Sequence, residues 1–516
     1  MVFTPQFTLL TCSRLSGLSM NTTNRLLTRS CFQLAMVKNK HQNHLNYLNR
    51  KDSTTSYIYQ HTYSSYQEMI AKEKQNAKSY MLIEDLTSKL KIDSKSNIES
   101  ILDTPVTNYW EYWIGNKHYF LVSLTDYPSF EKKSETILPE AKFPMSLRIY
   151  QITKLPSTKV SNESNKMSTK RWDLRMHRQS VKSANLLDGN DNLDENIRQF
   201  TYNISQSELE CKLKFFVINA FEEFFCQGVF NAFHLVPFGS SVNSLGWGSS
   251  GLDLCLTTKY QPLPSSILVP SAGDLLDGTI KRQRCIKTYH NMMKSGLIPG
   301  VNNVSQPNNN TCQVYSYLTA NDVTITCTDP ATLEFFKISE ILFEITRADE
   351  RVLHLIHFCK LWAEFQGILS RTFNNLILTM LIINYLQIRR PFPILPPLEQ
   401  FFSEPEIRMD KNMIQDTKSS FNDVLLGFFR HLGTFDFSHS GINIFLGKCI
   451  RKPTRDVLFV LDPAKGSNMS TKVSKNELDN ITKVGLKSYK LLASGCSLQT
   501  LLKPIALDTY KKTTLV

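Results

Sequence analysis

The sequence predicts an α/β (α+β) fold with a small mixed module, a larger mixed domain and a helical C-terminal region. Three observations support this prediction. The 516 residues suffice for two or three domains with substantial cores. Strand-like apolar runs alternate with helical periodicity as far as about residue 345, and helical periodicity dominates beyond it. A polar stretch over 155–198 has no sustained apolar period, so it is predicted to be a linker.

The first 50 residues are basic and contain no acidic side chain. The formal net charge of the chain is +13, and its first acidic residue is Asp52. A segment rich in Ser, Thr, Arg and Leu without acids is typical of a mitochondrial transit peptide, so residues 1–50 are predicted to be a transit peptide or disordered. The alternative is a disordered basic arm that binds RNA directly. The segment has no apolar run long enough for a membrane span.

The cysteine pattern predicts a reducing compartment. The eleven cysteines are scattered, and no two form a CxxC pair. An odd, unpatterned set favours reduced thiols packed as small apolar side chains over disulfides or zinc ligands. The mitochondrial matrix is such a compartment.

A small α/β module is predicted from about residue 78 to 154. Residues 79–86 predict a strand, and 94–104 predict a short helix capped by Ser96. Residues 109–124 predict a hairpin that turns at Gly115-Asn116 and carries aromatic residues on both arms. Such a sheet could stack RNA bases, or it could bury its rings against the helix or another subunit. Few basic residues flank the rings, which favours burial.

A glycine-serine turn between two strands is the first candidate site. An amphipathic helix over 207–225 precedes the segment VPFGSSVNSLGWGSSGLDLCLTT, residues 236–258. This segment predicts a strand, a turn at Gly239, a short helix and a second strand that bears Asp253. Backbone amides at a helix N-terminus bind phosphate, and Ser240 and Ser241 add hydroxyl donors. Asp253 could hold a metal ion, or it could be a buried polar residue that one of these serines satisfies.

The remainder of the chain predicts more helix than strand. Residues 278–296 predict a basic helix, whose charges either face solvent or contact RNA, and 313–329 predict two strands at a turn. Helical periodicity follows over 337–368 and 372–390, and the prolines of 391–398 end the second helix. The run NLILTMLIINYL is apolar on nearly all sides, as a central core helix is.

Nucleotidyl transfer requires a definite set of side chains. Divalent cations bridge the triphosphate and activate the attacking hydroxyl, and they prefer carboxylate oxygens. Two carboxylates at positions i and i+2 of one strand face the same side, and a third usually comes from a neighbouring strand. Cationic side chains neutralise the charge that develops in the transition state.

With these segments the chain resembles the mitochondrial poly(A) polymerases, a branch of the DNA polymerase β-like nucleotidyltransferase superfamily, from about residue 75 to 490. Five separate segments carry the resemblance: EKQNAKSYMLIED, VPFGSSVNSLG, SEILFEITRADERVLHLIHFCKLWA, LTMLIINYLQIRRPFPILPPL and LLGFFRHLGTFDFSHSGINIFLG. It implies an RRM-like domain at 75–154, the linker at 155–198, a nucleotidyltransferase palm at 199–345, a helical central and PAP-associated domain at 346–490, and a tail at 491–516.

The resemblance also implies an activity and partners. Members of the family add adenylate from ATP to an RNA 3′ end without a template, using Mg²⁺ or Mn²⁺. A mitochondrial matrix location is therefore expected. Relatives pair through the N-terminal module, so a homodimer, or a heterodimer with an active paralogue, is expected here.

The family's active site carries over only in part. Four nucleotide-binding positions match at Gly239, Ser240, Lys360 and Asn375, and Asp253 matches as the catalytic, metal-binding carboxylate. The family's Asp-x-Asp, however, is Gly251-Leu252-Asp253 here, so the first carboxylate is absent.

Three further positions depart from the family pattern. The third carboxylate is expected at Thr326, or at Cys327 if the strand slips by one residue. Asp322 and Asp329 lie at the two ends of that strand, and Asp329 is a candidate metal ligand only if a bulge turns it toward the site. A second basic residue on the helix of Lys360 is replaced by Glu364, and the aromatic residue after Asn375 is replaced by Leu376.

These departures predict weak or lost adenylyl transfer. Each missing carboxylate removes on the order of several kcal/mol of attraction to a nearby dication, and each 1.36 kcal/mol of transition-state stabilisation is about tenfold in rate. One alternative is a working polymerase with a rearranged metal site that uses Asp329 or Glu364. The other is a non-catalytic member that binds RNA or pairs with an active partner.

Overall fold

The computed structural model describes most of the chain after residue 64. The transit segment predicted at 1–50, most of the predicted linker and Asp329 lie outside the described residues. The described residues are 65–85, 95–114, 117–125, 147–151, 193–226, 233–248, 250–258, 279–294, 301–302, 307, 311–316, 321–327, 330–399, 414, 416, 418–463 and 466–503.

In its described residues, the first module is a four-stranded sheet with two helices. The strand order is β2-β3-β1-β4, and all three strand pairs are antiparallel. Ile114 pairs with Lys117, so the hairpin predicted to turn at Gly115-Asn116 is confirmed. The elements are α3 (Tyr66–Ala77), β1 (Tyr80–Asp85), α4 (Lys95–Leu102), β2 (Val106–Ile114), β3 (Lys117–Leu124) and β4 (Leu147–Gln151).

Three aromatic rings of the hairpin are buried. Tyr112 and Tyr119 are buried and stack with 5.3 Å between ring centroids, and Phe120 is fully buried. The prediction of burial is therefore confirmed for these three rings. The capping prediction for Ser96 is wrong, because this serine is the second residue of α4.

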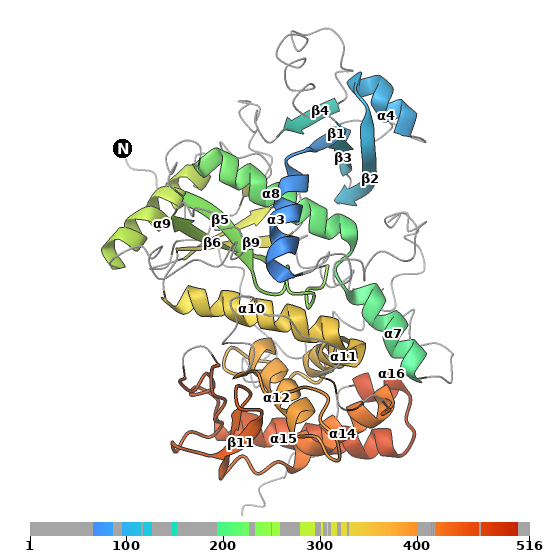
Figure 1. Ribbon diagram of the computed structural model, residues 1–516, viewed down its shortest axis with the longest axis vertical. Coiled ribbons are helices and arrows are strands. Elements are labelled where there is room, and N and C mark those ends of the chain that lie inside the picture. Colours follow the sequence, from blue (N-terminus) through green and yellow to red (C-terminus); the bar gives the residue numbers. More distant parts are fainter. Residues whose placement is uncertain are drawn as a thin grey trace, which may run out of the picture. The chain divides into compact units, whose positions relative to one another are not determined.

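A mixed sheet of order β5-β6-β9-β8-β7 forms the second part of the fold. Strands β6 and β9 are parallel, and the other pairs are antiparallel. Helices α8 and α9 pack on the face that carries Leu254, whereas Phe336 of α10 packs on the face that carries Cys255. Figure 1 shows α8 above and α10 below this sheet in the view. The elements are α7 (Leu193–Ile204), α8 (Glu208–Cys226), β5 (Phe233–Phe238), β6 (Leu252–Thr258), α9 (Thr279–Lys294), β7 (Val301–Asn302), β8 (Thr311–Ser316), β9 (Asn321–Cys327) and α10 (Pro330–Ala348).

Helix α7 begins inside the predicted linker. It starts at Leu193, so the predicted linker end at 198 is about one turn too late. Ile197 and Phe200 are almost fully buried in the helical core. These two apolar residues stand in an otherwise polar segment, so the apolar period was too short to predict a helix from the sequence.

The C-terminal part is a helical domain with one small hairpin. Helix α12 is buried from Ile377 to Gln387, which confirms the predicted core helix. The Trp362 indole donates to Ser488 Oγ at 3.0 Å and so links α11 to α15 inside the core. The elements are α11 (Glu350–Phe365), α12 (Asn375–Ile388), α14 (Phe421–Thr434), β10 (Ser440–Asn443), β11 (Lys448–Arg451), α15 (Lys475–Ala493) and α16 (Leu498–Leu502).

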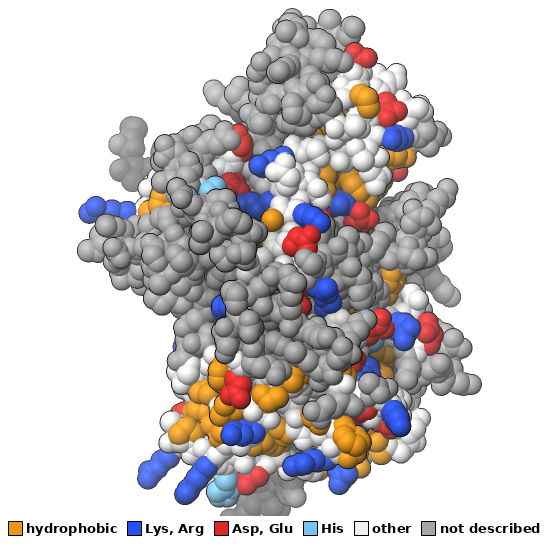
Figure 2. Space-filling model, viewed as in Figure 1, with side chains coloured by type: hydrophobic (Ala, Val, Ile, Leu, Met, Phe, Trp, Pro, Cys, Tyr) orange, Lys and Arg blue, Asp and Glu red, His pale blue; other side chains and the backbone are white. Residues whose placement is uncertain are grey.

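The visible surface carries charges of both signs. Figure 2 shows Lys and Arg side chains interspersed with Asp and Glu over the described residues of this face, with apolar side chains gathered toward its lower part. None of the described helices is both long and apolar enough to span a bilayer.

Candidate active site

The turn after β5 requires glycine at its first position. Gly239 has φ +78°, a left-handed conformation that side chains disfavour. A Cβ atom there would lie 2.9 Å from Asp253 Oδ2. The Gly239 amide donates to Ser339 Oγ at 2.9 Å, which ties the turn to α10. The Asp253 carboxylate thus occupies the space that a side chain at position 239 would need.

The prediction of a short helix after this turn is wrong. The amides of Val242 and Asn243 both donate to the Gly239 carbonyl at 3.2 Å, which makes one turn and no helix. The Asn243 side chain then accepts from the Leu245 amide at 3.1 Å, and Ser244 has φ +68°. Asn side chains that bind the following backbone compete with helix growth. Any anion bound here therefore meets the amides of one turn without the dipole of a full helix.

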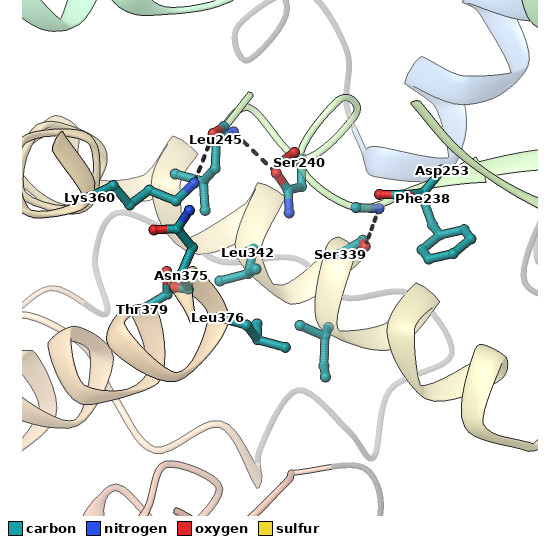
Figure 3. Close-up of a pocket in the computed structure, with 13 residues that line it drawn as sticks. Phe238, Ser240, Leu245, Asp253, Ser339, Leu342, Lys360, Asn375, Leu376 and Thr379 are labelled. Atoms are coloured by element: carbon teal, nitrogen blue, oxygen red, sulfur yellow. Dashed lines mark hydrogen bonds between the residues drawn. The ribbon is translucent and has the colours of Figure 1, made fainter. Parts of the chain in front are cut away.

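Asp253 is half-buried beside this turn on β6. Burial raises the pKa of its carboxyl above the ordinary value, whereas the Lys214 ammonium and a hydrogen bond with Thr324 lower it. Burial outweighs the two opposing effects. Figure 3 shows the carboxylate beside the Gly239 turn.

The strand register corrects the predicted third position. Asp253 pairs directly with Thr324 of β9, and Thr326 pairs with Cys255 two residues further along. Thr324, not Thr326, is therefore the β9 residue next to the carboxylate. The alternative of Cys327 is wrong as well, because its side chain is buried in the cluster on the opposite face of the sheet.

Asp322 shares the face of Thr324 and lies nearest to Gly251. A Cβ atom at Gly251 would be 3.9 Å from Asp322 Cβ and 3.2 Å from the Asp322 carbonyl oxygen. Gly251 lies just before β6, and its carbonyl accepts a hydrogen bond from Ser241 Oγ at 2.5 Å. A side chain at the position of the absent first carboxylate would therefore meet Asp322, at both its backbone carbonyl and its Cβ atom.

Lys360 reaches the turn from α11. Its ammonium donates to the Leu245 carbonyl at 3.0 Å and lies 6.0 Å from the centroid of the Trp247 ring. Burial lowers the pKa of Lys360 to about 8. Figure 3 shows this side chain and Asn375 pointing toward one another.

A second contact between α11 and the same loop determines which ring nitrogen of His357 carries the proton. The Trp247 indole donates to His357 Nδ1 at 2.8 Å, so His357 Nε2 carries the proton and lies 3.2 Å from the Ser244 carbonyl. Burial lowers the pKa of His357 to about 3, which keeps the ring neutral. The loop after the turn is therefore clamped to α11 at both His357 and Lys360.

A pocket of about 310 Å³ brings the predicted residues together. Gly239, Ser240, Asp253, Lys360 and Asn375 all line it, together with Leu376 from the next position. The neighbouring Asn374 caps α12 by accepting from the amides of Leu376 and Ile377. Glu364 is exposed on α11 and is not among the residues that line the pocket.

Sequence reasoning missed several residues that line the pocket. Ile338, Ser339 and Leu342 lie at helical spacing on α10, and Thr379 lies one turn after Asn375 on α12. Spacing of i and i+4 from a residue already identified could have found Thr379. The missed residues are Phe238, Asn243, Leu245, Ile338, Ser339, Leu342 and Thr379.

The donor set does not fit a pair of divalent cations. Asp253 is the single carboxylate among the described residues that line the pocket. Across all described residues, no group of three or more His, Cys, Asp or Glu side chains is arranged to hold a metal ion. Hard dications require several oxygen ligands of this kind. One carboxylate supplies too little negative charge for a two-metal site.

Residues 193–314 match the family model described as "Poly(A) RNA polymerase, mitochondrial-like, central palm domain". This match covers the Gly239 turn, Gly251 and Asp253. Over these residues the chain is similar to the central palm domain of mitochondrial-like poly(A) RNA polymerases. The family resemblance stated from the sequence is thereby confirmed.

Named relatives agree with this assignment. The chain is 26% identical over 329 residues to the mitochondrial poly(A) RNA polymerase of Drosophila melanogaster, covering 57% of this chain and 53% of the relative. It is 24% identical over 365 residues to the human protein of the same name, covering 65% and 62%. The chain thus spans between half and two thirds of the length of these relatives.

Solved structures of the family share the fold. A crystal structure of mtPAP in complex with ATPγS matches with a TM-score of 0.67 at 19% identity, covering 86% of this chain and 100% of that one. The apo form of mtPAP matches with a TM-score of 0.66 at 18% identity. The predicted α/β fold class is confirmed.

Proposed function

We propose that the chain is a nucleotide-binding member of the poly(A) polymerase family that acts at RNA 3′ ends and whose adenylyl transfer is weak or lost. In this proposal ATP lies in the pocket beside the Gly239 turn. The amides of the turn and Ser240 bind phosphate, and Lys360 adds positive charge. The apolar Leu342 and Leu376 accommodate the base, while Asn375 and Thr379 offer it hydrogen bonds.

The observation that carries this proposal is the pair of uncharged neighbours of Asp253. Gly251 has no side chain, and Thr324 stands where the neighbouring strand would supply an acid. Each missing charge removes on the order of several kcal/mol of attraction to a dication at an intermediate effective dielectric constant. A loss of that size is about a thousandfold or more in rate. Binding can survive these changes where turnover does not.

Location and partners follow from other features. The basic, acid-free N-terminus and the mitochondrial relatives support a location in the mitochondrial matrix. If turnover is lost, the remaining function is that of an RNA-binding protein or dimer partner that regulates polyadenylation, paired with a second copy or with an active paralogue. Light scattering of the purified chain, alone and mixed with an active relative, tests the pairing.

Primer extension tests the proposed loss of activity. The purified chain is incubated with labelled ATP, a short RNA primer and Mg²⁺ or Mn²⁺, and we expect little or no extension. The double variant Gly251→Asp/Thr324→Asp should gain measurable extension, because it restores acids on both sides of Asp253. Extension by the wild-type chain at ordinary polymerase rates would show that the proposal is wrong.

The strand register supplies a matched control. Gly251→Asp/Thr326→Asp adds the same two charges, but its second acid lies opposite Cys255. It should gain much less activity than the Thr324 version. Because a Cβ at Gly251 meets the Asp322 carbonyl at 3.2 Å, melting temperatures of both variants must be measured alongside.

A further inference from the structure

A lysine is buried beneath the glycine-serine turn. Lys214 belongs to α8, and only 2% of its surface is exposed. Its ammonium donates to Ser241 Oγ at 2.9 Å and to Gln206 Oε1 at 2.6 Å. Gln206 in turn donates from Nε2 to the Ser241 carbonyl at 3.2 Å. The ammonium is therefore fixed against the turn, and Lys214 is not among the described residues that line the pocket.

The hydrogen-bond directions show how this charge is coupled to the site. Ser241 Oγ has one proton and donates it to the Gly251 carbonyl, so it accepts from Lys214. Gly251 is two residues from Asp253 along the chain. The Lys214 ammonium is also the nearby charge that lowers the pKa of Asp253. One fixed cation thus serves both the turn and the one carboxylate found among the described lining residues.

The Lys214 ammonium disfavours the binding of a divalent metal ion at Asp253. A dication bound to Asp253 would have one carboxylate to hold it and would lie near the buried ammonium, which repels it. A triphosphate at the turn experiences the opposite effect, because its negative charge is attracted to both Lys214 and Lys360. The charges of the pocket favour the anion and disfavour the metal.

We propose that Lys214 supplies a fixed positive charge behind the turn of this pocket, in addition to Lys360, and that a nucleoside triphosphate binds at the turn without a divalent cation. This inference rests on the nucleotide binding proposed above. Lys214 acts through Ser241 and the turn, so it is a positioning residue and not a catalytic one.

Calorimetric titration of the full chain with ATP tests the inference. In excess EDTA and in Mg²⁺, the wild-type dissociation constants should agree within about threefold. Lys214→Met should weaken binding in EDTA by about tenfold or more, and added Mg²⁺ should then strengthen it, because the repulsion is gone. Lys214→Arg should keep the metal-independent binding of the wild type. If Lys214 had a purely structural role, Lys214→Met would weaken ATP binding without changing its dependence on Mg²⁺.

Lys212→Met is the matched control. Lys212 lies two residues earlier on α8, and its ammonium donates to Tyr80 and lies 5.2 Å from the Trp110 ring centroid. Its removal takes away the same charge from the same helix and should leave ATP binding within about twofold of the wild type. An equal loss in both variants would contradict the inference.

A second measurement uses the wild-type chain alone, in case Lys214→Met does not fold. Electron paramagnetic resonance of Mn²⁺ titrated into the nucleotide-free protein should detect no specific site at micromolar concentrations. A micromolar site that is lost in Asp253→Asn or Asp322→Asn would overturn the inference. ATP binding that requires Mg²⁺ would overturn it while leaving the proposed function intact, and absence of ATP binding in both conditions would overturn both.

Discussion

At the scale of single residues, Lys360 makes nucleotide binding depend on pH. Burial lowers the pKa of this lysine to about 8, so the side chain is charged below that pH and becomes neutral above it. A charged ammonium attracts phosphate and a neutral amine does not. ATP affinity, measured by calorimetry in EDTA, should therefore fall several-fold from pH 7 to pH 9.

Two variants show whether this dependence comes from Lys360. Lys360→Met should bind ATP more weakly at pH 7 and show little further change up to pH 9. Lys287→Met removes an exposed lysine from α9 and should retain the wild-type profile. A wild-type affinity that stays constant across this range would contradict the assignment.

Single residues also show what could be predicted from the sequence. The glycine turn and Asp253 were identified by residue type and spacing, whereas Lys360 and Asn375 were implied by the family resemblance. All of them line one pocket. Their roles in binding remain predictions. Thr324 was missed because strand register depends on pairing partners, and a small shift changes which residue meets Asp253. Lys214 was missed because a lysine in an amphipathic helix normally reaches toward solvent.

At the scale of elements, α14 and α15 approach closely through glycine. A Cβ at Gly433 would lie 2.8 Å from the backbone of Leu486, and one at Gly485 would lie 3.1 Å from Leu432 Cγ. Gly433→Ala should therefore lower the free energy of unfolding by about 1–3 kcal/mol, because overpacking outweighs the better helix propensity of alanine. Urea denaturation measures the change.

The neighbouring residue provides the control. Thr434→Ala alters the exposed last turn of α14 without adding any atom against α15, and its effect should stay within about 0.5 kcal/mol. If Gly433→Ala also changes the free energy of unfolding by no more than about 0.5 kcal/mol, the two helices do not approach as closely as described.

Helices and turns could be predicted where residues within one segment determine the local structure. The Gly115-Asn116 hairpin and the α12 core helix follow from turn residues and apolar periodicity within one segment. The helix expected after Gly239 did not form because the Asn243 side chain binds the backbone that a helix would use. The start of α7 was misplaced because its apolar contacts are made with a distant part of the chain.

At the scale of the whole molecule, the first module and the central sheet share one core. Buried residues of α3, β1 and β3 belong to the same cluster as those of α8, β6 and β9. Polar contacts follow the same path, since Gln67 donates to Glu340 at 3.1 Å and Lys74 pairs with Glu222 at 2.6 Å. The two parts are therefore expected to unfold together.

Tyr66 tests this coupling. Its ring is 3% exposed and lies 5.6 Å from the Phe343 ring of α10. Tyr66→Ala should cost about 3–5 kcal/mol and shift circular dichroism and tryptophan fluorescence transitions equally in urea. Tyr109→Ala, a half-buried ring against the small cluster of the first module alone, should cost less. If the two parts share a core, a cavity at Tyr66 must destabilise both the first module and the central sheet. Two separate transitions in Tyr66→Ala, with the second at the wild-type midpoint, would therefore show that the first module unfolds independently of the central sheet.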